Sequence, residues 1–435
     1  DHAGARSSRR RQSLIRPSMT RIQLEPIDRA LLDGELGPAA AHAMALLLRY
    51  GEVLDADHFV PIHSAHIDGC LYHGPSSIDF VQRFVDLNGR VRVPTTLNVA
   101  AVDVVHPGWH QGDPAVIDAQ RELTRLHEQL GCLATLTCAP YQRMIQPLLG
   151  EHIAWAESNA IVFANSVLGA RTDRYGDFTD LCAAITGRAP YVGLHRPENR
   201  LATLLVEVPD RATSALSADL YFACLGYELG KRSVGHVPAI VNLASASRDE
   251  LKALGAAAAS SGALAMFHVV GLTPEASTLA EAVGGVEHDL AKARISEEDL
   301  RQALARLCPL ENGEPIAAVC LGTPHFSIEE FERLAGLCET QSSTARVEIY
   351  VSTSREIEGL VRARADMAAL FDFGVQIVVD TCTYLAPVVR EKRGAIATNS
   401  GKWAHYGPGN LKRRVGIMTL ERCLRSAAAG QVVPL

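Results

Sequence analysis

The 435-residue sequence lacks a long hydrophobic run, and basic residues are not clustered anywhere beyond its first twenty positions. A membrane-spanning helix needs about 18 or more apolar residues in a row, and a secretory signal needs an apolar segment of about 7 to 15 residues. Neither pattern occurs, so we expect no membrane partner and a cytoplasmic location. The net charge of -7 argues against nucleic acid as a partner, because phosphate recognition requires clustered Lys and Arg.

The ten cysteines include no C-x-x-C pair, which excludes a zinc ribbon or a thioredoxin-like redox site. Without a secretion signal, a disulfide framework is not expected either. Most of these residues are predicted to be buried as small apolar side chains. A metal cluster assembled from cysteines that are distant in the sequence remains open.

The first twenty residues contain five arginines and several serines. This composition is typical of a transit peptide, a basic arm or a disordered leader, and we predict a disordered leader at residues 1–20. The remaining chain, residues 21–435, exceeds the ~250 to 300 residues at which single cores usually stop growing. We therefore expect two or three lobes around one cleft.

Apolar strand-like runs alternate with helical patterns along the chain, which predicts an α/β fold with parallel sheets. The predicted strands are 59–62, 91–94, 161–164, 204–208, 239–241, 265–270, 316–320, 346–351 and 376–379. The predicted helices include 39–50, 76–88, 247–261, 277–307 and 327–336.

Ligand sites in such sheets form where strands end, so polar clusters directly after strand-like runs are candidate functional residues. Five clusters fit this position: 61–66, 94–98, 137–140, 323–325 and 380–382. Two of them hold Cys138 and Cys382, each preceded by a threonine. Turns of this kind present thiolates to iron-sulfur clusters, although two buried thiols would give the same pattern.

Three histidines lie in the same clusters, namely His63, His66 and His325. Such side chains bind carboxylates or transfer protons near neutral pH, and a purely structural role is the alternative. The first two do not form an H-E-x-x-H zinc site, because no glutamate follows the first histidine.

Two further polar runs predict parts of a pocket. Glu157, Asn159 and Arg171 surround the predicted strand 161–164, where unpaired polar groups would be costly to bury unless they line a site or cap a helix. Asn399, Ser400 and Lys402 form a polar loop that can bring an ammonium group and backbone amides to an anion. The loop lacks P-loop spacing, which favours a carboxylate over a nucleotide, and a plain surface turn is the alternative.

Taken together, these motifs resemble the catalytic large region of the aconitase X family, and the resemblance extends from Ile22 to the end of the chain. The matching motifs are 32–37, 64–69, 94–98, 137–141, 156–160, 165–171, 324–325, 380–382 and 399–402. The resemblance implies an aconitase-like three-layer α/β body, with lobes around a central cleft. It also implies an iron-sulfur-dependent dehydratase.

One departure from the family pattern concerns the cluster ligands. The archaeal type of the family has Gly-Cys-Pro-His where this chain has Thr323 in the cysteine's place. This change favours a smaller 2Fe-2S cluster held by Cys138 and Cys382, with Cys320 recruited as the third ligand. A 3Fe-4S cluster and mononuclear iron are the alternatives.

The resemblance implies two substrates for the family, cis-3-hydroxy-L-proline and mevalonate 5-phosphate. We expect dehydration of the first to Δ1-pyrroline-2-carboxylate, with the second as the alternative and a non-catalytic acid-binding homologue as a third possibility. The resemblance further implies that the base is a serine on a small swivel domain, which we expect on a separate subunit. The residues predicted to be catalytic are His66, Lys402 and Ser400. Those predicted to bind the small hydroxy acid are Ser64, His63, Thr96, Asn98, Glu157, Asn159, Arg171, His325 and Asn399.

Overall fold

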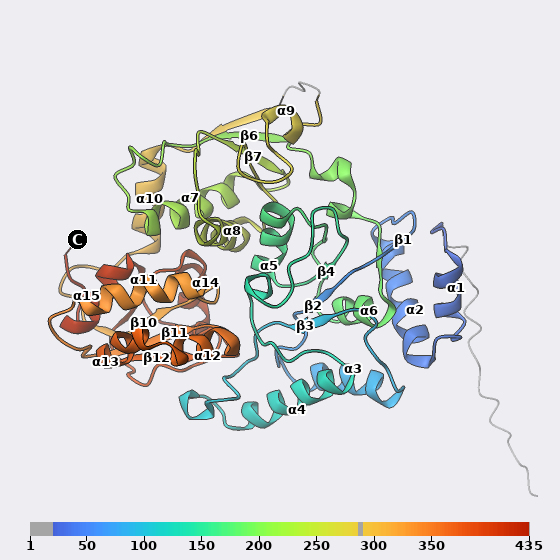
Figure 1. Ribbon diagram of the computed structural model, residues 1–435, viewed down its shortest axis with the longest axis horizontal. Coiled ribbons are helices and arrows are strands. Elements are labelled where there is room, and N and C mark those ends of the chain that lie inside the picture. The colour runs from blue at the N-terminus through green and yellow to red at the C-terminus, as the bar shows by residue number, and fades with distance from the viewer. Residues whose placement is uncertain (1–20, 286–289, 435) are drawn as a thin grey trace, which may run out of the picture.

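The computed structural model describes residues 21–285 and 290–434, which fold into three α/β lobes, each with its own sheet and hydrophobic core (Figure 1). In Figure 1 the first lobe occupies the right and bottom of the molecule, the second the top and the third the left. The predicted leader at residues 1–20 lies outside the described residues. None of the described helices is both long enough and apolar enough to cross a bilayer.

The first lobe contains a three-stranded parallel sheet in the order β3-β2-β4 and a two-stranded antiparallel sheet, β1-β5. Its elements are α1 (Pro26–Leu32), α2 (Pro38–Val53), β1 (Phe59–Pro61), β2 (Ala65–Ile67), α3 (Pro75–Asp86), β3 (Thr95–Leu97), η1 (Pro107–Trp109), α4 (Ala115–Gln129), η2 (Pro140–Gln142), β4 (Ala154–Trp155), α5 (Ser158–Phe163), η3 (Ala164–Leu168), α6 (Thr179–Thr186), β5 (Arg188–Pro190), η4 (Gly193–His195) and η5 (Pro197–Arg200). A proline at the first position starts α1, α2 and α3, where its missing N–H costs no hydrogen bond.

The second lobe is a four-stranded parallel sheet in the order β8-β7-β6-β9. Its elements are β6 (Leu204–Glu207), α7 (Ala218–Arg232), β7 (Pro238–Val241), α8 (Arg248–Gly262), β8 (His268–Val269), α9 (Leu279–Ala282), β9 (Ala291–Arg294) and α10 (Glu297–Leu307). Helices α7 and α8 pack closely because Gly226 has no side chain: a Cβ there would lie 2.2 Å from the carbonyl oxygen of Leu254.

The third lobe is a five-stranded parallel sheet in the order β12-β11-β10-β13-β14. Its elements are β10 (Ile316–Leu321), α11 (Ile328–Glu339), β11 (Glu348–Ser352), α12 (Arg355–Ala363), η6 (Ala365–Met367), α13 (Ala368–Phe373), β12 (Val375–Val378), β13 (Ala395–Thr398), α14 (Gly401–Leu411), β14 (Val415–Ile417) and α15 (Leu420–Ala429). The strand order reverses between β10 and β13, and ligands bind at such a switch point, outside the carboxyl ends of the strands.

The predicted α/β class with parallel sheets is confirmed, and most of the strands predicted in the second and third lobes form within a few residues of their expected positions. Three predictions were wrong. The run 161–164 belongs to helix α5 and the start of η3, the strand expected at 91–94 forms as β3 at Thr95–Leu97, and strand β9 interrupts the helix expected over 277–307.

Candidate active site

Strand ends of the first and third lobes meet at one cleft with a volume of about 760 Å³. From the first lobe, Asp68 follows β2, Asn98 follows β3 and Glu157 comes shortly after β4. From the third lobe, Cys382 comes after β12 and Lys402 lies in the first turn of α14, just beyond β13. The cleft is lined by Asp68, Leu71, Asn98, Val99, Cys138, Ala156, Glu157, Ser158, Ile161, Arg174, Tyr175, Gly176, Asp177, Cys382, Tyr384, Leu385, Lys402, Tyr406 and Asn410.

The thiols of Cys138 and Cys382 face each other in this cleft, with their Sγ atoms 4.0 Å apart. Both residues are 1% exposed. With His325 they form a group whose potential ligand atoms all lie within 4.8 Å of one another. The hydrogen bond from Cys138, helped by His325 and Lys402, lowers the pKa of Cys382 well below its usual value, whereas burial raises the pKa of Cys138.

This group has the chemistry of a metal site. Two thiolates on one tetrahedral metal, each about 2.3 Å from it, would be about 3.8 Å apart, close to the spacing of these two thiols. The backbone N–H of His325 donates to the Sγ atom of Cys138 at 3.3 Å, as amides do to cluster-bound sulfur. Thiolate and imidazole donors together suit iron or zinc rather than magnesium or calcium.

The environment of His325 fixes its imidazole ring. The Nδ1 atom lies 3.0 Å from Oγ1 of Thr137, and Nε2 lies 3.2 Å from the carbonyl oxygen of Thr381. Because these two partners flank Cys138 and Cys382 in the chain, the ring ties the two thiol-bearing loops together. Sequence reasoning expected Cys320 as the third ligand, but Cys320 is not a member of the group, and β10 carries its side chain into the core beside Thr383.

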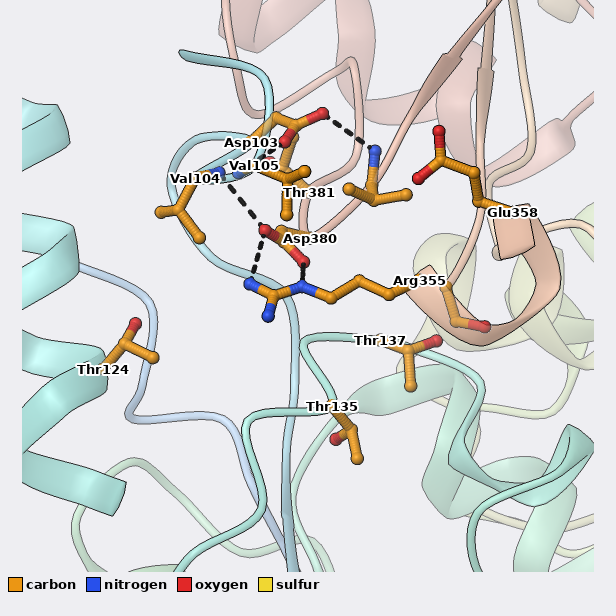
Figure 2. Close-up of polar contacts among 12 residues, drawn as sticks. Asp103, Val104, Val105, Thr124, Thr135, Thr137, Arg355, Glu358, Asp380 and Thr381 are labelled. Carbon is orange, nitrogen blue, oxygen red and sulfur yellow. Dashed lines mark hydrogen bonds and ion pairs between the residues drawn. The ribbon is translucent and has the colours of Figure 1, made fainter. Parts of the chain in front are cut away.

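An ion pair also holds the loop that carries Cys382 (Figure 2). Arg355 donates two hydrogen bonds to the fully buried carboxylate of Asp380, at 2.6 and 2.9 Å. From the first lobe, the backbone N–H of Val104 donates to the same carboxylate, and Asp103 accepts from the N–H of Val379. These contacts fasten the residues just before Cys382 to the first lobe.

Lys402 and Glu157 form a buried ion pair across the cleft, with Nζ 2.5 Å from Oε1 and side-chain exposures of 4% and 6%. Burial opposes both charges. For Lys402, the carboxylate of Glu157 is the main group that outweighs burial, and the pKa is raised well above its usual value. The pKa of Glu157 is lowered instead, because the charge of Lys402 and the backbone N–H donors together outweigh burial. Glu157 is also the N-cap of α5, since its carboxylate accepts from the N–H of Ala160.

Asp68 and Asn98 lie side by side because the strands before them pair in parallel, Ile67 with Leu97. The Nδ2 group of Asn98 donates to the Asp68 carboxylate. Burial, with Glu157 and Asp177 nearby, raises the pKa of Asp68 to about 7. Sequence reasoning missed Asp68, because β2, the strand that precedes it, has only three residues and was not predicted.

The other predicted residues fall into several groups. The side chains of His66 and Thr96 form a hydrogen bond beneath the cleft, and burial lowers the pKa of His66 to about 4. Three more make hydrogen bonds within the protein: Ser64 accepts from Trp155, Asn159 donates to the carbonyl oxygen of Cys138, and Ser400 caps α14. Asn399 lines a second cavity. His63 and Arg171 lie apart from the cleft, beside His152.

Sequence reasoning also missed other cleft residues, among them two tyrosines and two charged residues. Tyr384 and Tyr406 stack with their ring centroids 5.8 Å apart, and Arg174 and Asp177 lie at the exposed side of the cleft. None of the four directly follows a strand, so the strand-end rule could not select them.

Comparison with protein families agrees with this architecture. Models of the aconitase X first, second and third domains match residues 21–198, 202–305 and 316–429. A crystal structure of Thermococcus kodakaraensis aconitase X in its holo-form is similar to this chain, with a TM-score of 0.83, 32% identity, and coverage of 93% of this chain and 100% of that one.

Three curated proteins are similar over most of the chain. The cis-3-hydroxy-L-proline dehydratase of Hypocrea jecorina is 41% identical, over 94% of this chain and 69% of its own length. The protein of the same name from Pseudomonas aeruginosa is 42% identical, over 94% and 70%. The phosphomevalonate dehydratase large subunit of Thermococcus kodakarensis is 36% identical, over 86% and 92%.

Proposed function

Because the chain belongs to the aconitase X family, we propose that it is the catalytic region of an iron-sulfur hydro-lyase that converts cis-3-hydroxy-L-proline to Δ1-pyrroline-2-carboxylate. The observation that carries the proposal is the pair of facing thiols, Cys138 and Cys382, in one cleft with a buried lysine. The identity of 41 to 42% to two dehydratases of this name supports the substrate.

Cys138 and Cys382 would hold the iron. His325, in place of Cys320, is the third candidate ligand, and its Nδ1 atom would have to exchange the contact with Thr137 for the metal. Bound there, the iron would supply a Lewis acid for the departing hydroxyl group. We favour a 2Fe-2S cluster, because only two thiols belong to the group formed by the described residues.

The residues of the chain itself would bind and orient the substrate. Lys402 would anchor the substrate carboxylate, since its ammonium group is charged, buried and directed to the cleft. Glu157 pairs with that charge, and Ser400 starts the helix that presents Lys402. The residue types suit a small acid, because a buried ammonium binds carboxylates strongly.

The resemblance to the aconitase X family assigns abstraction of the α-proton to a serine on a small swivel domain, although Asp68 also lines the cleft and its pKa is raised to about 7. His66 lies beneath the cleft floor and burial lowers its pKa to about 4. We therefore propose that a small swivel domain on a separate subunit supplies a serine as the base. About 30% of the length of each hydroxyproline dehydratase lies outside the matched region, which leaves room for such a domain in the same chain in those relatives. The Thermococcus relative is named a large subunit, which implies a partner subunit in that branch.

The charges that line the cleft disfavour mevalonate 5-phosphate. Asp68, Glu157 and Asp177 contribute three carboxylates, against the two cations Arg174 and Lys402. A phosphate dianion requires clustered cations, whereas an amino acid carries an ammonium group that carboxylates attract. The cytoplasm is the proposed compartment, because all ten cysteines are free and free thiols persist in a reducing environment.

The test is anaerobic purification of this chain with its small domain, followed by iron analysis and assay. We expect a coloured, iron-containing preparation that forms Δ1-pyrroline-2-carboxylate from cis-3-hydroxy-L-proline. A colourless, iron-free complex that forms no product would refute the assignment as an enzyme and leave an acid-binding homologue.

A further inference from the structure

All three lobes meet at the main-chain carbonyl oxygen of His325. It accepts a hydrogen bond from Nε2 of Gln142 at 2.9 Å and a longer one from Nζ of Lys252 at 3.4 Å. Gln142 belongs to η2 of the first lobe and Lys252 to α8 of the second, whereas His325 lies between β10 and α11 of the third. The main chain of the candidate metal ligand is therefore held from two other lobes.

Lys252 is itself fixed in place by two carboxylates. Its side chain is 2% exposed, and Nζ lies 2.8 Å from Asp249 and 2.5 Å from Glu330. Both acids also accept from Ser327, whose hydroxyl donates to Asp249 at 2.7 Å and whose backbone N–H donates to Glu330 at 2.9 Å. Because Ser327 lies two residues after His325, these contacts tie the same stretch of chain to the second lobe.

The other side of His325 faces the thiols. Its N–H donates to Sγ of Cys138, and its ring nitrogens lie within the group that also contains Cys382. To bind a metal, Nδ1 would have to leave Thr137, so that contact could not orient the ring in the loaded protein. The two hydrogen bonds to the carbonyl oxygen would persist. Partners that hold a ligand residue from behind strongly affect metal affinity.

We infer that Gln142 and Lys252 are positioning residues for the metal centre, which hold the main chain of His325 so that its ring and its N–H face the two thiols. The inference rests on the proposed function, because it requires a metal at this group. Both residues line the second cavity, which has a volume of about 590 Å³, rather than the cleft, so they would act through His325 and not by touching substrate. The second lobe thereby helps to hold a metal whose candidate ligands come from the first and third lobes.

The first test removes the neutral donor from the iron-loaded complex of this chain with its small domain. Gln142→Leu deletes the shorter hydrogen bond without changing a charge. We expect a chelator to strip iron about three- to tenfold faster, as the loss of one neutral hydrogen bond implies. Gln146→Leu is the matched control, because Gln146 lines the same cavity but donates to the carbonyl oxygen of Gln142 instead of that of His325. Its stripping rate should stay within about twofold of the wild-type rate.

The charged donor needs a pair of variants, because Lys252→Met alone would leave two buried carboxylates without their cation. Glu330→Gln keeps Lys252 beside Asp249 and the carbonyl oxygen, so it should lose iron within about twofold of the wild-type rate. Adding Lys252→Met leaves one carboxylate in place of two carboxylates and one ammonium, which keeps the net charge. We expect iron loss from this double variant to be at least ~3-fold faster than from Glu330→Gln. Equal rates would exclude Lys252 as a positioning residue.

A spectrum distinguishes positioning from a merely structural role. Visible circular dichroism of the iron-loaded complex reports the geometry of the ligands, whereas a loss of stability alone does not change it. We expect the spectrum of Gln142→Leu to differ from that of the wild type, and the spectrum of Gln146→Leu to match it. Should the double variant fail to fold, Gln142→Leu and its spectrum decide.

The outcomes separate this inference from the proposed function. If the wild-type complex holds iron but does not turn over cis-3-hydroxy-L-proline, the proposed function fails, while faster iron loss from Gln142→Leu still supports the inference. If the wild type does turn it over, and Gln142→Leu equals Gln146→Leu in both iron loss and spectrum, only the inference is refuted. A wild-type complex that takes up no iron refutes both.

Discussion

Cys138 and Cys382 place their Sγ atoms 4.0 Å apart, although 244 positions separate them in the chain. One comes from the first lobe and the other from a strand end of the third, so the pair exists only when both lobes are folded and docked. The separation is about twice the length of a disulfide bond, and it matches two thiolates on one metal centre. The predictions below concern this centre and the residues around it.

Replacing either thiol should remove the metal. We expect Cys138→Ser and Cys382→Ser to lose most of the bound iron and the visible absorbance, because a hydroxyl group is a poor ligand for iron-sulfur clusters. Iron analysis of anaerobically purified protein measures this. Cys338→Ser, which changes a buried cysteine in the core of the third lobe, is the control and should keep its iron. Full iron content in Cys382→Ser would show that the ligand assignment is wrong.

The ion pair between Lys402 and Glu157 should matter both for stability and for binding. Lys402→Ala leaves a buried carboxylate without its partner, which costs about 3–5 kcal/mol of unfolding free energy. Denaturant unfolding of the isolated chain measures the loss. The double variant Lys402→Met with Glu157→Gln should regain most of the stability, because no charge is then left unpaired.

Substrate binding should not recover in that double variant if Lys402 anchors the substrate carboxylate. We expect KM to remain at least ~10-fold above the wild-type value in both variants. A double variant with a wild-type KM would show that the pair has only a structural role.

The contact between Arg355 and Asp380 should control how firmly iron is retained. Arg355→Ala removes two hydrogen bonds from a buried carboxylate two residues before Cys382, at a cost of about 1.5–3 kcal/mol. We expect a chelator to strip iron several times faster from this variant. The control is Arg364→Ala, since Arg364 has similar exposure and two ion pairs on the surface of the third lobe. Equal stripping rates in the two variants would contradict the role of Arg355.

The acid side of the pH profile should report Asp68. Its pKa is raised to about 7, so the carboxylate loses its charge as the pH falls through that value, and its attraction for an ammonium group is lost with it. We expect kcat/KM for cis-3-hydroxy-L-proline to fall below about pH 7 and to recover above it. In Asp68→Asn this limb should flatten at a lower kcat/KM, and an unchanged limb would assign the titration to another group.

The sequence predicted the sheets of the second and third lobes better than those of the first. Strands such as β10 are continuous apolar runs of several residues, whereas β2 and β4 span three and two residues and give no periodic signal. The run 161–164 was predicted to be a strand, but a short apolar segment fits a buried strand and a buried helix equally well. The N–H of Ala160 donates to the carboxylate of Glu157, and this N-cap hydrogen bond stabilises the helix at this position.

The strand-end rule selected Cys138, Cys382 and His325, which the fold does bring close together. It could not rank Cys320 against His325. That choice depends on the face of β10 from which Cys320 points and on the path of the loop that carries His325, and these are tertiary properties. Asn98 was expected to bind substrate, but its hydrogen bond to Asp68 became apparent only from the fold.

The most direct test of the central claim is the ratio of kcat/KM for cis-3-hydroxy-L-proline to that for mevalonate 5-phosphate, measured on one iron-loaded preparation of this chain with its small domain. We predict a preference for cis-3-hydroxy-L-proline of at least ~100-fold, because the cleft holds three carboxylates and a single buried lysine. Product formation should disappear in Cys382→Ser, which lacks one of the two facing thiols. Equal values, a preference for mevalonate 5-phosphate, or full turnover without iron would contradict the account.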